Sequence, residues 1–167
     1  MIKIIDNFYG DMVSNAIQKG MLSLDFPWFF CENIVSKSPT NNFQFTHVFY
    51  KEGEPKTDFY TDLVTLGVLK KLEIAALVKI KANFQSKTES IIKNPLHVDH
   101  SFPNCLTAIY YVNTNNGFTY FEDGKVVESV KDRMVIFSSN MLHGGTTCSD
   151  KKYRCVINFN FYPTYEV

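Results

Sequence analysis

In the first half of the chain, apolar residues recur mainly at the spacing of amphipathic helices. Within residues 8–19 and again within residues 58–72, apolar positions fall three or four residues apart. This spacing predicts two helices. Strands are predicted around these helices at residues 2–6, 27–31, 43–51 and 74–83.

The second half of the chain consists of short alternating runs that are separated by turn residues. Strands are predicted at residues 95–99, 105–113, 117–122, 125–130, 133–138 and 153–162. Asp123-Gly124 and Asn116-Gly117 supply the left-handed positions of tight turns. Closely spaced strands of this kind favour an antiparallel sandwich or barrel, with the N-terminal helices covering one sheet face.

Size and composition indicate one β-rich globular domain. The 167 residues are enough for one well-buried domain and short for two. Aromatic residues make up 15% of the chain, and their side chains suit pleated sheet surfaces. The formal net charge is zero, so neither nucleic acid nor an anionic membrane is an expected partner.

The cysteines and the N-terminus indicate a reducing compartment. The four cysteines form no CxxC pair, and the first residues lack the basic-then-apolar layout of a secretory signal. No apolar run approaches the length of a membrane span. We therefore expect a cytoplasmic protein with reduced thiols, in which Cys105 and Cys155 lie in the core.

The tripeptide His97-Val98-Asp99 is the main candidate for chemistry, together with His143 far downstream. Side chains alternate across a strand, so His97 and Asp99 are expected on one side and His100 on the other. Two histidines and one carboxylate are the ligand set of non-haem Fe(II) oxygenases, which leaves coordination positions open. The alternative is that both histidines are ordinary half-buried side chains and that Asp99 caps a turn.

Arginine is rare in this chain, because only Arg133 and Arg154 are arginine among 17 basic residues. Arg154 belongs to an alternating run with one polar and one apolar face. The polar face must point into a wet or ligand-filled interior, where an arginine needs an anionic partner. Its planar fork suits a carboxylate, although a salt bridge to a nearby Asp or Glu is the alternative. Arg133, in a predicted turn, is expected to be solvated.

Tyr111 lies on one face of the predicted strand at residues 105–113, together with Thr107 and Ile109. Its hydroxyl could lie near the same carboxylate that Arg154 binds. An ordinary core tyrosine is the alternative for this position.

Residues 96–162 resemble the 2-oxoglutarate- and Fe(II)-dependent dioxygenases of the prolyl 4-hydroxylase-like type. The blocks that carry this resemblance follow one another in the family's order: His97-Val98-Asp99, residues 106–113, residues 116–121, residues 131–137, and His143 with residues 154–159. Two positions depart from the family pattern. Asn116 replaces the first glycine of a Gly-Gly pair, and several members have lysine where this chain has Arg154.

The resemblance implies a mainly β protein with flanking helices (α+β). The expected fold is a double-stranded β-helix, or jelly roll, with the N-terminal helices packed on one sheet. We expect a single dioxygenase domain over residues 1–167. Residues 1–83 would supply helical support and outer strands, and residues 84–167 the metal-binding core.

The resemblance also implies an enzymatic activity. His97, Asp99 and His143 would hold Fe(II), while Arg154, Tyr111 and Asn158 would bind the co-substrate 2-oxoglutarate. With O₂, turnover would release succinate and CO₂ and would hydroxylate a peptide or small-molecule substrate. Hydroxylation is expected because the Asp99 carboxylate fills the position that a halide takes in related halogenases.

Two other functional classes remain open. A cupin-like metalloprotein would use the same triad without 2-oxoglutarate, so that Arg154 would have no role. A non-catalytic β-sandwich binding protein would bind no metal. The sequence names neither the prime substrate nor the oligomeric state. Small enzymes of this appearance are common in tailed phages and marine microbes, and a phage protein would act in the host cytoplasm.

Overall fold

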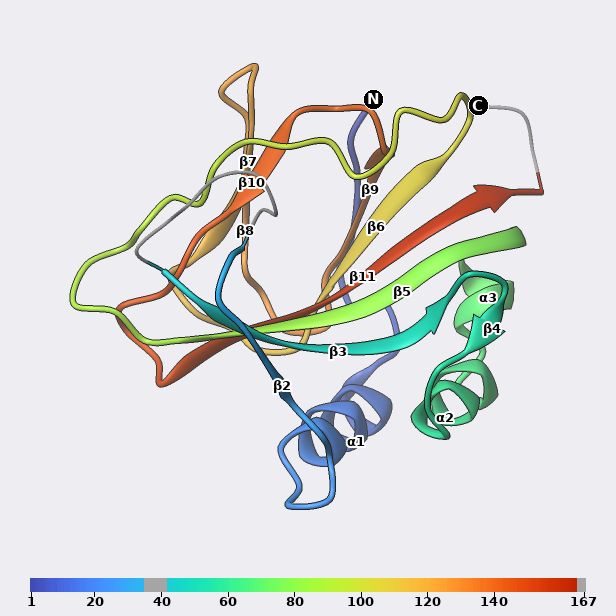
Figure 1. The fold of residues 1–167 in the computed structure, drawn as a ribbon, viewed down its shortest axis with the longest axis horizontal. Helices are drawn as coiled ribbons and strands as arrows, with labels where there is room; N and C mark the ends of the chain where they lie inside the picture. Colours follow the sequence, from blue (N-terminus) through green and yellow to red (C-terminus); the bar gives the residue numbers. More distant parts are fainter. Residues whose placement is uncertain (35–41, 165–167) are drawn as a thin grey trace.

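The computed structural model describes residues 1–34 and 42–164, which form two antiparallel sheets (Figure 1). In spatial order, the strands along the larger sheet are β1 (Lys3–Ile5), β9 (Met134–Ser138), β6 (Leu106–Tyr111), β11 (Tyr153–Pro163), β5 (Ile74–Ser86), β3 (Gln44–Lys51) and β2 (Phe29–Cys31). The two-residue strand β4 (Glu54–Pro55) pairs with β3. The smaller sheet consists of β10 (His143–Gly145), β7 (Phe118–Phe121) and β8 (Val126–Glu128).

Three helices, α1 (Asp11–Met21), α2 (Phe59–Thr65) and α3 (Val68–Lys71), lie on one side of the larger sheet (Figure 1). A first hydrophobic cluster joins them to the outer face of that sheet and includes Ile17, Leu63 and Val68. A second cluster lies between the two sheets and includes Tyr111 and Phe121. The predicted mainly β architecture with helices packed on one sheet is therefore confirmed.

Strand β11 shows how the alternating sequence produces these layers. Its apolar residues, Cys155, Ile157, Phe159 and Phe161, belong to the cluster under the helices. The residues between them, Arg154, Val156, Asn158 and Asn160, line a cavity on the opposite face of the sheet. The predicted polar face of this strand is thus confirmed. Cys105 and Cys155 are 0% and 1% exposed, which confirms that both are core residues.

The helices depart from the predicted ranges at two backbone positions. The single helix expected at residues 58–72 is divided, because Gly67 adopts a left-handed conformation (φ 80°) between α2 and α3. Glycine reaches that region without steric cost, so it ends the first helix. The first helix begins at Asp11 and not at Phe8.

Asp132 explains the late start of α1. Its carboxylate is buried and accepts hydrogen bonds from the backbone N–H of Gly10 (2.7 Å) and Tyr9 (3.0 Å). The hydroxyl of Tyr110 donates a third bond, of 3.0 Å. The backbone N–H groups of Tyr9 and Gly10 are therefore hydrogen-bonded to Asp132 beside the sheet, and the helix begins only at Asp11.

Arg133, expected to be solvated, is instead mostly buried. Its guanidinium Nε lies 2.6 Å from a carboxylate oxygen of Asp6, and its side chain is only 17% exposed. Asp6 directly follows β1, so the pair joins the ends of two adjacent strands.

The strand predicted at residues 95–99 is wrong. His97 forms only an isolated bridge with His143, and the backbone bends at Asp99. Strand β10 was not predicted, because its three residues His143-Gly144-Gly145 carry little strand propensity. Among the described helices, none has the length and apolar character needed to cross a membrane.

Candidate metal centre and adjoining cavity

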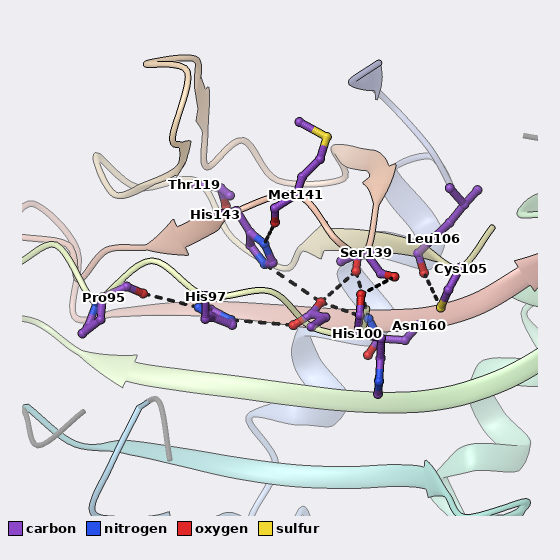
Figure 2. A network of polar contacts seen from close by, with 12 residues as sticks. Pro95, His97, His100, Cys105, Leu106, Thr119, Ser139, Met141, His143 and Asn160 are labelled. Carbon is purple, nitrogen blue, oxygen red and sulfur yellow. Dashed lines mark hydrogen bonds and ion pairs between the residues drawn. The ribbon is translucent and has the colours of Figure 1, made fainter. Parts of the chain in front are cut away.

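His97, Asp99 and His143 meet at one end of a cavity between the two sheets. Their ligand atoms all lie within 4.8 Å of one another. Nε2 of His97 is 3.6 Å from Oδ1 of Asp99, and Nε2 of His143 is 3.9 Å from Oδ2. Figure 2 shows the two rings arriving from separate chain segments, with Asn160 projecting from β11 near the same point.

Backbone carbonyl groups orient both histidine rings. Nδ1 of His143 donates to the carbonyl of Met141 (3.0 Å), and Nδ1 of His97 donates to that of Pro95 (3.3 Å). A carbonyl can only accept, so each Nδ1 carries a proton, and Nε2 is the ring nitrogen that faces Asp99. Metal-binding histidines are commonly oriented in this way.

The Asp99 carboxylate is held in its ionised form. Burial by itself would raise its pKa, but the opposing contacts prevail and keep the pKa well below its usual range. These contacts come from the neighbouring His97 and His143 rings and from hydrogen bonds donated by Asn160 (2.9 Å) and Thr107 (2.8 Å). A metal ion requires this deprotonated form.

The His143 imidazole is held in its neutral form. The ring is 3% exposed, and burial lowers its pKa despite the nearby carboxylate. Two imidazole nitrogens and one carboxylate oxygen converge at a point on the cavity wall. This donor set suits non-haem Fe(II) with open coordination positions.

His100 lies outside this cluster. Its ring stacks on Phe102, with centroids 5.3 Å apart and an interplanar angle of 9°. Its backbone N–H and carbonyl are both hydrogen-bonded to Ser139. Residues 97–100 do not form a strand, so strand alternation is not the reason that His100 lies apart. The backbone bend at Asp99 separates the side chain of His100 from that of Asp99.

We expect His100→Ala to bind Fe(II) as tightly as the unchanged protein, because the ring contacts none of the three converging ligand atoms. Anaerobic titration with Fe(II) would measure this affinity. A clear loss of stoichiometric binding, with an unchanged circular dichroism spectrum, would mean that His100 is a ligand.

Arg154 lies in the same cavity, at the end of the larger sheet where β11 begins. Its side chain is 5% exposed. Its guanidinium donates to the hydroxyl oxygens of Ser129 (3.0 Å) and Thr119 (3.3 Å), and its charge lies 5.7 Å from the Tyr111 ring centre. No ion pair to Arg154 occurs within residues 1–34 and 42–164, so the salt bridge considered as its alternative is not found there.

Two glycines make room for the Arg154 side chain. A Cβ atom on Gly117 would lie 2.8 Å from Cδ of Arg154 and 2.7 Å from the backbone oxygen of Thr147. One on Gly145 would lie 3.3 Å from Nη1 of Arg154. Asn116, which replaces the first glycine of the family's Gly-Gly pair, is exposed, so its side chain has room there.

Tyr111 and Asn158 occupy different places relative to the cavity. Tyr111 is fully buried and does not line the cavity; its hydroxyl donates to Thr119 (2.8 Å). Asn158 lines the cavity, and its Oδ1 atom is buried with no hydrogen-bond partner in the described part of the chain.

Strand β5 supplies cavity residues that the sequence analysis missed. Lys79, Lys81, Asn83 and Gln85 all line the cavity. Oδ1 of Asn83 and Nε2 of Gln85 are buried and have no hydrogen-bond partner among residues 1–34 and 42–164. The alternation of these polar residues with Ile80, Ala82 and Phe84 was the available signal, and it matches the pattern that identified Arg154.

Comparisons by sequence gave no match, either among protein-family models or among curated proteins. Solved structures do match. A prolyl hydroxylase from Trichoplax adhaerens, in complex with a hypoxia inducible factor oxygen degradation domain peptide fragment, has a TM-score of 0.60 at 18% identity. The match covers 96% of this chain and 83% of that one.

Two further structures extend this likeness. An oxidoreductase of the 2OG-Fe(II) oxygenase family from Burkholderia pseudomallei has a TM-score of 0.64 at 12% identity, covering 96% and 85% of the two chains. HygX from Streptomyces hygroscopicus, solved with nickel and 2-oxoglutarate bound, has a TM-score of 0.61 at 10% identity, covering 98% and 83%. The chain therefore shares the double-stranded β-helix fold of the prolyl hydroxylases and other 2OG-Fe(II) oxygenases.

Proposed function

We propose that this protein is an Fe(II)- and 2-oxoglutarate-dependent dioxygenase that hydroxylates a peptide or small-molecule substrate. The observation that carries the proposal is the buried Arg154 guanidinium, which lies in the same cavity as the His97, Asp99 and His143 cluster. A buried charge is costly without a counter-ion. A dicarboxylate that reaches from the metal to Arg154 would supply that charge.

His97, Asp99 and His143 would hold the iron through Nε2, a carboxylate oxygen and Nε2. Bound Fe(II) would supply the activation of O₂, coupled to conversion of 2-oxoglutarate to succinate and CO₂. The contacts of Asp99 with Thr107 and Asn160 would keep its carboxylate in place throughout turnover.

Thr119 would assist Arg154 in binding the distal carboxylate of 2-oxoglutarate. Its hydroxyl oxygen accepts hydrogen bonds from both Tyr111 and Arg154. A hydroxyl has two acceptor positions and one donor, so only its hydrogen remains available. Because Thr119 lines the cavity, that hydrogen can be donated to a carboxylate there. Tyr111 would not contact the co-substrate itself. It would orient Thr119 through its hydrogen bond and Arg154 through its ring.

The wall of the cavity between Arg154 and the metal ligands is polar. Asn158, together with Asn83 and Gln85 on the adjacent strand β5, presents amide atoms to this space that have no partner among the described residues. These amides would hydrogen-bond the co-substrate or ordered water and would orient it between Arg154 and the metal. Asn158 would then have the binding role that the family resemblance implies.

We also propose that the enzyme works in a cytoplasm. All four cysteines are free, including Cys31, which is partly exposed. Free thiols are typical of a reducing compartment, and such a compartment also favours ferrous iron.

The proposal is tested by separating metal binding, co-substrate binding and turnover. Anaerobic calorimetry would first measure Fe(II), and then 2-oxoglutarate added to the loaded protein. Air and ascorbate, which supplies reducing equivalents when no prime substrate is present, would then be added and succinate measured by NMR. Iron-dependent succinate formation is the expected result. Metal binding without 2-oxoglutarate binding would instead favour the cupin-like alternative, and absence of both would favour a binding protein.

We expect Gly117→Ala to weaken 2-oxoglutarate binding about tenfold or more, because the added Cβ displaces the Arg154 side chain. The added Cβ would also lie 2.7 Å from the backbone oxygen of Thr147, which cannot move aside as a side chain can. Calorimetry with Mn(II)-loaded protein would measure the change. Gly20→Ala is the matched control, since a Cβ there meets nothing within 4 Å. Equal losses in the two variants would show that the effect is not specific to Arg154.

A further inference from the structure

Lys79 and Lys81 form a pair of cationic side chains on the cavity side of β5. Both line the cavity that contains the metal ligands, and both line the adjoining hollow toward β2 and β3. In the sheet, Lys79 is opposite Asn160 and Lys81 is opposite Asn158. The pair therefore lies near the metal end of the cavity, where Asn160 contacts Asp99.

Neither lysine has an ion-pair partner within the described residues. Burial, and secondarily the charge of Lys79, lowers the pKa of Lys81 to about 8, although Asp99 opposes the shift. Lys81 is still mostly protonated at neutral pH. The Asp99 carboxylate does not neutralise it by a direct contact, because its oxygens face the two histidines and accept from Asn160 and Thr107.

The cavity has an excess of positive charge that the proposed cofactors do not remove. Three basic side chains line it, Lys79, Lys81 and Arg154, whereas Asp99 is the single carboxylate in the lining. Fe(II) and the 2-oxoglutarate dianion would cancel each other. The excess is local, since the chain as a whole has zero formal net charge. Glu32, at the edge of the adjoining hollow, is exposed to solvent.

Along β5, the lysine pair lies too far from Arg154 to bind the same carboxylate group. Arg154 is opposite Gln85 in the sheet, whereas Lys79 is six residues away along β5. At about 3.3 Å per residue, this separation is roughly 20 Å for Lys79 and about 13 Å for Lys81. The carboxylate that Arg154 binds therefore leaves both lysines without an anionic partner.

We propose that the prime substrate of this enzyme carries an oxyanion group, a carboxylate or a phosphate, which Lys79 and Lys81 bind beside the metal centre. This inference rests on the proposed function, because it assigns Arg154 to 2-oxoglutarate. The hollow lined by Cys31, Asn33, Gln44 and both lysines gives the substrate a path from solvent to that position. Pairing with an anion would relieve the cost of two neighbouring partly buried cations.

The test uses the full chain loaded with Mn(II) and saturated with 2-oxoglutarate, without oxygen. Inorganic phosphate and trifluoroacetate serve as the probes, and their ³¹P and ¹⁹F resonances relax faster when they bind near the paramagnetic ion. The double variant Lys79→Gln/Lys81→Gln removes the proposed site. Lys19→Gln/Lys70→Gln is the matched control, because it removes the same charge from exposed positions on α1 and α3.

We expect at least one probe to bind the unchanged protein and the control equally, and to bind the Lys79/Lys81 variant about tenfold more weakly or worse. A preference for phosphate would identify a phosphorylated substrate, and comparable binding of trifluoroacetate would identify a carboxylate. An equal affinity in all three proteins would show direct contact with the metal and would overturn the inference, as would no relaxation of either probe. In both cases, intact Mn(II) and 2-oxoglutarate affinities would leave the proposed function standing. Loss of those affinities in the unchanged protein would refute both.

Discussion

His143→Ala is expected to abolish stoichiometric Fe(II) binding and, with it, succinate formation. The variant removes one of the three proposed ligands and leaves His97 and Asp99, which would not enclose the metal from both sheets. Loss of a contact outside the ligand set typically costs 10- to 100-fold in metal affinity, so we expect more than about a hundredfold here. Iron per chain, measured after anaerobic loading and desalting, would give the result.

The His143 ring is also a packing element, since its centre lies 4.7 Å from that of Phe137. His143→Gln, which keeps most of the volume, separates loss of the ligand from loss of packing. Thermal unfolding of both variants would verify the fold, and His100→Ala serves as the matched histidine control. Full iron occupancy in folded His143→Gln and His143→Ala would remove His143 from the ligand set.

Arg154→Ala is expected to weaken 2-oxoglutarate binding on the order of a hundredfold while leaving Mn(II) affinity nearly unchanged. A charge-assisted bidentate contact contributes about 2–3 kcal/mol, and about 1.4 kcal/mol corresponds to a tenfold change in affinity. Arg154→Lys should recover part of the loss, because the charge returns but the planar fork does not. Anaerobic calorimetry with Mn(II) as an inert substitute for iron would measure all three proteins.

Mn(II) affinity is the internal control for this series, because Arg154 is buried and its removal could disturb the fold. If folded Arg154→Ala binds 2-oxoglutarate as tightly as the unchanged protein, the co-substrate role of Arg154 is wrong. The cupin-like alternative, in which this arginine has no role, would then be favoured. A loss of both affinities would indicate a structural role for Arg154.

Local sequence patterns predicted most strands because alternation of polar and apolar residues reports directly on the two faces of a strand. On β11 this pattern assigned Arg154 to the interior and Phe159 to the helix-covered face, as the structure has them. The same rule, applied to β5, would have found Lys79 and Lys81. Strand β5 carries no histidine, carboxylate or arginine, so residue chemistry alone did not mark its cavity face.

The convergence of His97 and Asp99 was predicted correctly, but the strand that was expected to produce it is absent. The two side chains do point to a common position, but no strand ladder places them there. The backbone bends at Asp99, and bonds from Thr107 and Asn160 hold the carboxylate. Those partners lie 8 and 61 residues away along the chain, so no local pattern contains the second of them.

The sequence by itself determined the layers of the protein and the identities of its reactive groups, because periodicity and residue chemistry are local properties. It therefore specified a mainly β chain, the His-x-Asp tripeptide with a distant histidine, and an arginine on an interior face. Only the tertiary structure decided that β5 completes the cavity, that Thr119 and Tyr111 lie beside Arg154, and that two lysines line the cavity with His97, Asp99 and His143. These arrangements depend on pairing between distant strands, whose register is set by packing across the whole sheet.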